Sequence, residues 1–318
     1  MVIDTNSKFR INIIFLMVAL IMAYYFSELR FGVNSIYENA TPMQMVLGTA
    51  ETPYQYRVLL AWLVKGLLLL PMMPETAVDG IFQVLEFLSV FALLVAFRVF
   101  LSLFFHHLLL ASVLTFTLFY ILPFNLLFNF WYPYDIPSLL FFTLALIALY
   151  RHSWGWYFLI FIPASFNRET TLLLTFLFVI VNWDVIPTKK LAIYTAVQLV
   201  VWVVIKLGLQ NLYITNPGTA VQFTLIDNLR FLAQPGGWLW FLPNWGMLWV
   251  LVLIGYRWIA DRFVKRALWV VFPLFLIMLL VGNIYELRIY AELIPIILLA
   301  SLLIIQALFK MESTTLAS

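Results

Sequence analysis

The sequence predicts an all-α, polytopic transmembrane helix bundle of about ten helices, and its composition and apolar runs support this fold class. Of the 318 residues, 64% are hydrophobic and 10% are charged, whereas soluble domains are about half apolar and about a quarter charged. Runs approaching the roughly 20 apolar residues that cross a hydrocarbon core of about 30 Å recur along the chain. Because these runs are continuously apolar rather than alternating, we expect helices and not barrel strands.

The expected spans depend on two open choices. Segment 58–73 is apolar enough to span, and 154–182 can be read as one long helix or as a hairpin of two short ones. Cytoplasmic loops are enriched in Lys and Arg, which favours an outer position for 58–73 and the hairpin, because eleven of the eighteen basic residues then face the cytoplasm. The spans expected on this reading are 11–27, 80–100, 108–124, 136–150, 154–165, 168–182, 191–209, 245–260, 267–282 and 289–309, with both termini cytoplasmic.

We expect a single integral membrane domain, 1–318, with polar loops at 28–79 and 210–244 on the non-cytoplasmic side. Lys8 and Arg10 precede the first apolar run, and no small-residue cleavage site follows, so this run is expected to remain as an uncleaved helix. The absence of cysteine excludes disulfides and thiolate metal sites. The basic residues are dispersed and form no stripe, which argues against a nucleic-acid partner.

The first outer loop holds three carboxylates that qualify as a general base: Glu28, Glu38 and Glu51. A carboxylate at a membrane surface can accept a proton from a hydroxyl, and the sequence does not rank the three. The alternative is that they are solvated loop residues. Tyr54 and Arg57 follow, and Arg57 is read either as a ligand for an anion or as an interfacial arginine that extends to the headgroups.

Three further positions carry charge where the spans meet the outer face. Asp135 opens a helix, where it can simply cap the first turn. Arg168 and Glu169 lie between two apolar runs, and ionisable residues at such depth usually serve function. A guanidinium can bind a phosphate through two parallel hydrogen bonds, although Arg168 can also be neutralised by Glu169 or Asp135. Glu286 and Arg288 lie at the start of the last span, where they either bind a substrate or simply neutralise each other.

Taken in chain order, these features resemble the GT-C superfamily of membrane glycosyltransferases. The matching features are the acidic loop after the first helix, Pro-Tyr-x-Tyr-Arg-x-Leu at 53–59, Asp135, Arg-Glu-Thr at 168–170 and Glu-x-Arg-x-Tyr at 286–290. In that superfamily the catalytic acid is usually an aspartate of the first outer loop. No aspartate occurs in this loop before Asp79, so the resemblance passes that role to Glu28, Glu38 or Glu51.

The resemblance implies a GT-C-like fold, in a short member without a soluble C-terminal domain, located in a bacterial inner membrane. Its activity would be transfer of a sugar from a polyprenyl-phosphate donor to a glycan or lipid acceptor at the non-cytoplasmic face. No cofactor or metal site is expected, although a divalent metal is compatible with the reaction. The substrate-binding residues would be Tyr54, Arg57, Asp135, Arg168, Glu169, Glu286 and Arg288.

Two other classes of membrane protein remain open. A lipid-linked glycan polymerase or flippase would also use outward-facing arginines and aromatic residues. A proton-coupled transporter would depend on Glu86, Glu292 and Lys206 within the bundle, and would often show two halves related by a repeat, which this sequence lacks.

Overall fold

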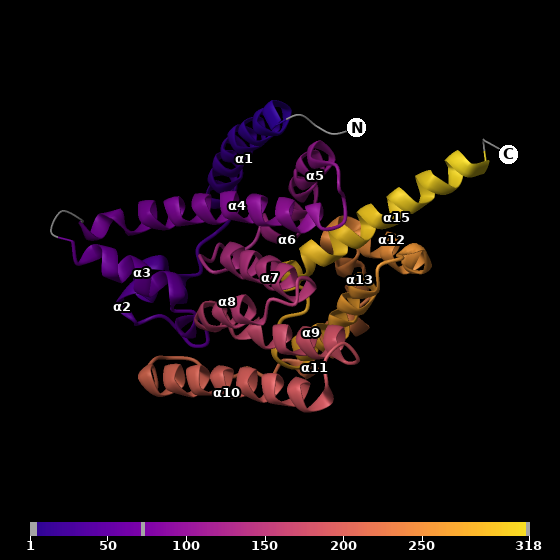
Figure 1. The fold of residues 1–318 in the computed structure, drawn as a ribbon. Coiled ribbons are helices and arrows are strands. Elements are labelled where there is room, and N and C mark those ends of the chain that lie inside the picture. Colours follow the sequence, from indigo (N-terminus) through magenta and orange to yellow (C-terminus); the bar gives the residue numbers. More distant parts are fainter. Residues whose placement is uncertain (1–4, 71–73, 316–318) are drawn as a thin grey trace. The chain divides into compact units, whose positions relative to one another are not determined.

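The computed structural model describes residues 5–70 and 74–315, and within these ranges the chain forms helices and turns without a strand. The fold class is therefore helical, as predicted (Figure 1). Six helical stretches of the described residues are long and apolar enough to cross a membrane, which identifies a helical integral membrane protein. They are Thr5–Val33, Glu75–Ser102, Leu108–Leu126, Thr188–Leu212, Arg262–Val281 and Leu287–Lys310.

The contacts divide the chain into two compact units, where the sequence predicts one domain. Unit 1 comprises 1–119, 127–171 and 200–220. Within it α4 lies between α1 and α7 and packs on both, while α8 packs on the other side of α7 (Figure 1). The helices of unit 1 are α1 (Thr5–Val33), α2 (Pro42–Leu47), α3 (Leu59–Leu68), α4 (Val78–Ser102), α5 (Leu108–Thr115), α7 (Asp135–Tyr150), α8 (Trp154–Asn167) and the second half of α10 (Thr188–Leu212).

The first helix continues further than the sequence predicts. Its expected end is at residue 27, but α1 runs to Val33, so Glu28 lies within the helix with an exposed side chain and the outer loop begins later. Arg30, in the last turn, is buried. The helix can carry a buried arginine in this turn because Glu86 and Asp135, on neighbouring helices, neutralise its charge.

Segment 58–73, for which the sequence allows an outer position or a span, forms α3 (Leu59–Leu68). Residues 71–73 of this segment lie outside the described part of the chain. Ten helical residues extend about 15 Å, half of a hydrocarbon core of about 30 Å. This length agrees with the outer position. The region 154–182 is two helices, because α8 ends at Asn167, Arg168 is extended with φ −161° and ψ 142°, and a 3₁₀ turn at Glu169–Thr171 precedes α9.

Unit 2 comprises 120–126, 172–199 and 221–318. Its helix α12 packs on α15, α13 packs on α9 and α15, and α11 packs on α14. Arg262 and Arg266 of α13 both pair with Asp184, which follows α9, and the hydrogen bond from Arg266 contributes most to lowering the pKa of this carboxyl to about 2. The helices are α9 (Leu172–Asn182), α11 (Leu225–Ala233), α12 (Leu248–Gly255), α13 (Arg262–Ala267), α14 (Val271–Val281) and α15 (Ile294–Thr315); α6 (Leu118–Leu126) begins in unit 1 and continues into unit 2.

The predicted outer loop 210–244 contains structure that the sequence reading missed. α10 extends into it as far as Leu212, and α11 lies in its middle. The Asn228 side chain on α11 donates to the carbonyls of Leu279 and Gly282 at 2.9 and 2.7 Å, and so fastens α11 to the end of α14. Short 3₁₀ turns complete the fold: Glu38–Ala40, Tyr54–Tyr56, Glu75–Ala77, Glu169–Thr171, Gly237–Phe241, Asn244–Met247, Tyr256–Trp258, Leu268–Val270 and Leu287–Leu293.

Candidate functional site

A buried ion network joins three helices of unit 1. Arg30 on α1 donates from Nη1 to Glu86 on α4 at 2.9 Å and from Nη2 to Asp135 on α7 at 2.8 Å, and these side chains are at most 2% exposed. The Trp131 indole donates to the second oxygen of Glu86. Charges in a low-dielectric interior are tolerated only when they are paired and hydrogen-bonded. One guanidinium therefore fixes the relative positions of α1, α4 and α7.

Two further arginines continue this network towards the first loop. Arg168 Nη1 lies 3.6 Å from Asp135 Oδ1. Arg57 donates from Nε and Nη2 to the two carboxylate oxygens of Glu169 at 3.2 and 2.7 Å, a bidentate pair. The break between α8 and α9 places Arg168 and Glu169 side by side, and the 3₁₀ turn at Tyr54–Tyr56 directs Arg57 to them. The cluster of Arg30, Arg57, Glu86, Asp135, Arg168 and Glu169 is called the charged cluster below.

A stack of tyrosines lines the charged cluster. The rings of Tyr54 and Tyr132 are stacked with centroids 5.2 Å apart, and those of Tyr132 and Tyr134 with centroids 5.1 Å apart. The Arg57 guanidinium carbon lies 4.4 Å from the centroid of Tyr134, and the Arg57 Nη1 donates to the Tyr134 hydroxyl. Cation–π contacts of this kind strengthen when water is excluded. The stack thus connects the first loop with the start of α7.

Of the three candidate bases, Glu51 is the one held next to the tyrosine stack. Its carboxylate accepts hydrogen bonds from the Tyr37 hydroxyl at 2.8 Å and from Asn39 at 3.1 Å, and the ring of Tyr37 lies 5.1 Å from that of Tyr54. The hydrogen bond to Glu51 and burial raise the pKa of Tyr37 above its usual value, so this hydroxyl remains a donor. Glu28 and Glu38 have exposed side chains.

The loop that carries Glu51 is tied to the segment after α10. Thr52 donates its backbone N–H to the Pro217 carbonyl at 2.8 Å, and Asn216 donates to the carbonyls of Gly48 and Ala50 at 2.9 and 2.8 Å. These contacts all lie within unit 1. The first loop is therefore fixed around residues 48–52 rather than being a solvated connection.

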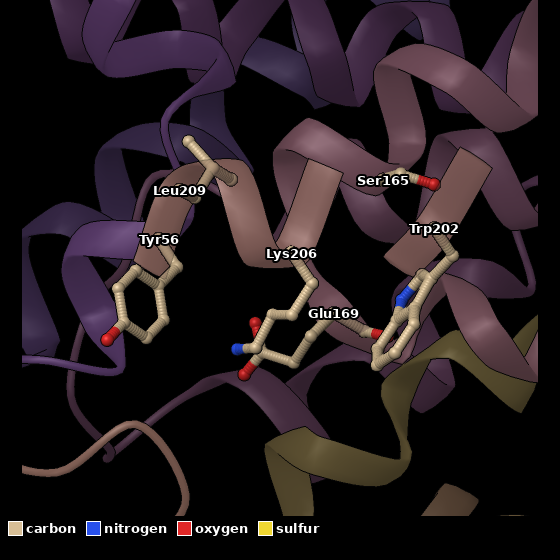
Figure 2. A pocket seen from close by; sticks show the side chains of 6 residues that line it. All are labelled: Tyr56, Ser165, Glu169, Trp202, Lys206 and Leu209. Atoms are coloured by element: carbon tan, nitrogen blue, oxygen red, sulfur yellow. The ribbon is translucent and has the colours of Figure 1, made fainter. Parts of the chain in front are cut away.

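A small pocket opens beside Glu169. Figure 2 shows the Lys206 side chain of α10 reaching into it, with the Tyr56 and Trp202 rings at its sides. The Trp202 indole donates to the Glu169 carbonyl at 2.9 Å. The pocket is lined by Tyr56, Ser165, Glu169, Trp202, Lys206 and Leu209.

The last pair of predicted site residues lies in unit 2. Arg288, 4% exposed, donates to Glu286 at 2.9 Å, and Asn283 donates to the other oxygen of Glu286 at 2.9 Å. The structure thus brings Tyr54, Arg57, Asp135, Arg168 and Glu169 together in unit 1, while Glu286 and Arg288 pair with each other in unit 2.

Sequence reasoning missed Arg30 and gave Glu86 no partner. The signal was available in one respect, because an arginine and a carboxylate at membrane depth need each other. Within the described ranges, no three His, Asp or Glu side chains gather closely enough to hold a metal ion. No protein-family model, no curated protein and no solved structure matches this chain.

Proposed function

We propose that the chain is a GT-C-like glycosyltransferase that moves a sugar from a polyprenyl-phosphate donor to a glycan or lipid acceptor. The proposed setting is the non-cytoplasmic face of a bacterial inner membrane, with a bundle of about ten helices and both termini in the cytoplasm. The observation that carries the proposal is the charged cluster with its tyrosine stack. Three guanidinium groups, buried beside an aromatic surface, suit a substrate that combines a phosphate with a sugar ring.

The reaction assigns a role to each part of this site. The oxygen of an acceptor hydroxyl attacks the anomeric carbon of the donor, the bond from that carbon to the phosphate oxygen breaks, and the electron pair stays on the phosphate. A carboxylate takes the hydroxyl proton. Glu51 is the proposed base, because Tyr37 and Asn39 orient it beside the tyrosine stack, whereas Glu28 and Glu38 have exposed side chains.

The arginines stabilise the departing phosphate as its charge develops. Glu169 occupies the fork of Arg57, so an incoming phosphate competes with this carboxylate. Arg168 also lies next to Tyr134, with its guanidinium carbon 5.7 Å from the ring centroid. The two arginines, both next to Tyr134, can therefore contact one anion.

The test is sugar transfer by the purified protein from a polyprenyl-phosphate sugar. Arg57→Lys and Arg168→Lys keep the charge but lose the planar fork, and we expect each to lower kcat by about tenfold to a hundredfold. Glu51→Gln should abolish transfer, while Glu38→Gln should leave it intact. Arg230→Lys is the matched control, because Arg230 is 76% exposed and belongs to unit 2.

Full activity in both arginine variants would refute the phosphate-binding roles. A lack of transfer by the unmutated protein with every donor supplied would favour a lipid-linked glycan polymerase or flippase. A proton-coupled transporter predicts a different pattern, in which Glu86→Gln and Glu292→Gln abolish function and the arginine substitutions are mild.

A further inference from the structure

The second half of α10 has two faces of opposite character. Val200, Val203, Val204 and Leu207, at helical spacing, are 41–63% exposed. Trp202, Lys206 and Leu209, spaced by four and three residues, line the pocket beside Glu169 (Figure 2). Because α10 is one of the helices long and apolar enough to span a membrane, the exposed valine and leucine face is the face that lipid covers. The pocket thus lies just behind a lipid-facing helix.

The pocket and the Arg57 side chain behind Glu169 together carry more positive than negative charge. The Lys206 ammonium lies 4.4 Å from the Tyr56 ring centroid and interacts electrostatically with Glu169, but it forms no salt bridge with the described residues. Glu169, the carboxylate that lines the pocket, has both oxygens engaged by Arg57. Two cations, Lys206 and Arg57, are therefore matched by one anion at this place.

Some hydrogen-bond donors at the pocket have an acceptor in the protein, and others do not. Ser165 donates to the Phe161 carbonyl at 2.8 Å, and the Trp202 indole donates to the Glu169 carbonyl. The Lys206 ammonium and the Tyr56 hydroxyl make no hydrogen bond with the described residues. An ammonium and a hydroxyl that have no hydrogen-bond acceptor among the described residues are groups that an anion with several oxygen atoms can bind.

The depth of Lys206 indicates which anion is at hand. Lys206 precedes Leu212, the last residue of α10, by six positions, or roughly 9 Å at about 1.5 Å per residue. A lysine this close to a helix end reaches the level of the lipid headgroups. The phosphates of the surrounding lipids are present there at high local concentration.

We infer that this pocket binds the phosphate group of an anionic membrane phospholipid, held by Lys206 and Tyr56. The pocket shares Glu169 with the charged cluster, but the inference requires no donor sugar. A bound lipid here would contact Trp202 and the α10 face that covers Glu169. It would thereby stabilise the wall of the charged cluster.

The experiment measures lipid adducts on the full-length protein in detergent by native mass spectrometry, with dioctanoyl phosphatidylglycerol as the probe. We expect Lys206→Met to raise the Kd for phosphatidylglycerol about tenfold or more, since a charge-assisted hydrogen bond is lost. Lys206→Arg should stay within about threefold of the unmutated protein. Lys65→Met is the matched control, because Lys65 also lies in an apolar helix but is exposed and outside the pocket.

Three further probes identify the source of the phosphate. Dioctanoyl phosphatidylcholine should bind more weakly, because its choline offsets the phosphate charge. Inorganic phosphate that competes as well as phosphatidylglycerol would overturn the lipid assignment, as would binding of polyprenyl phosphate without binding of phosphatidylglycerol. An unchanged Kd in Lys206→Met, in a variant that melts at the temperature of the unmutated protein, would overturn the site itself. None of these readouts depends on sugar transfer, so their failure leaves the proposed function standing.

Discussion

Arg30 carries a buried charge in the charged cluster and depends on carboxylates for its neutralisation. It is 1% exposed and is paired with two carboxylates that come from different helices. The desolvation of three charges is offset only while all three remain together. Loss of Arg30 should therefore lower the stability of the fold more than loss of an exposed charge does.

Replacing Arg30 by methionine tests this dependence. Arg30→Met keeps an apolar stem but leaves Glu86 without its cation and Asp135 with Arg168 alone, and we expect a loss of stability of about 3–5 kcal/mol. The measurement is the melting temperature of the purified protein. Adding Glu86→Gln and Asp135→Asn to this variant should recover part of the loss.

Arg230→Met provides the comparison, since Arg230 is 76% exposed and pairs with Asp227 one turn away. Exposed pairs of this kind contribute about 0–1 kcal/mol. Equal melting temperatures for Arg30→Met and the unmutated protein would show that the buried pairs contribute nothing.

The residue types of the site could be predicted from the sequence, but their pairings could not. Arg57 and Arg168 stand out because guanidinium groups near membrane depth are costly. Arg57 and its partner Glu169 are 112 positions apart, and only tertiary packing decides that Glu169 pairs with Arg57 rather than with the adjacent Arg168. Arg30 was passed over because its neutralising partners lie on other helices.

At the scale of single elements, α11 shows how a short helix is fixed at the edge of unit 2. Asn228 is 1% exposed, donates to carbonyls at the end of α14, and accepts from the backbone N–H of Ile284 at 3.2 Å. The carbonyls at a helix end have no partner within the helix. Asn228 satisfies them and so couples the two helices.

Removal of this side chain should loosen α11 without unfolding the bundle. In Asn228→Ala we expect faster hydrogen exchange of the amides of 225–233, because the carbonyls of α14 lose their donor and α11 loses its attachment. Asp227→Ala is the control, since Asp227 is 78% exposed. Unchanged exchange in Asn228→Ala would mean that apolar packing and the hydrogen bonds from Thr224 to Leu280 and Gly282 hold α11 without Asn228.

The elements differ in how far the sequence could define them. The break between α8 and α9 was predicted from Arg168 and Glu169, because charges interrupt an apolar run. The helix α11 was missed, since nine residues that include Asp227 and Arg230 have the composition of a polar loop. The end of α1 was misplaced because Glu28 and Arg30 also have the composition of a loop, and the carboxylates that neutralise Arg30 are remote in sequence.

At the scale of the whole molecule, the proposed orientation can be tested by cysteine labelling. The chain has no cysteine of its own, so each introduced cysteine reports on one position. Single cysteines at Phe128 and Ile214, 85% and 75% exposed, should react with a membrane-impermeant maleimide in intact cells. A cysteine at Trp183, 71% exposed, should react only after permeabilisation, because the proposal places it in the cytoplasm. Labelling of positions 128 and 183 from the same side would refute the proposed arrangement of spans.

Composition predicts that the chain is a helical membrane protein, but it does not decide how many helices cross the membrane. Apolar runs identify the helices, and six stretches of the described chain reach spanning length. The helices α7 and α9 have 16 and 11 residues, and α12 has eight, so composition and length alone do not decide whether they cross. Short helices depend on their neighbours for depth and tilt, which a sequence does not state.

The wide spacing of the Arg30 partners has a consequence for biosynthesis. Glu86 and Asp135 lie 56 and 105 positions after Arg30. At about 5–20 residues per second, the ribosome makes Glu86 roughly 3–11 s after Arg30 and Asp135 roughly 5–20 s after it. During that interval α1 is a nascent helix with an unneutralised guanidinium. Because Arg30 lies in the last turn of α1, it can wait at the headgroup level and become buried only when α4 and α7 arrive.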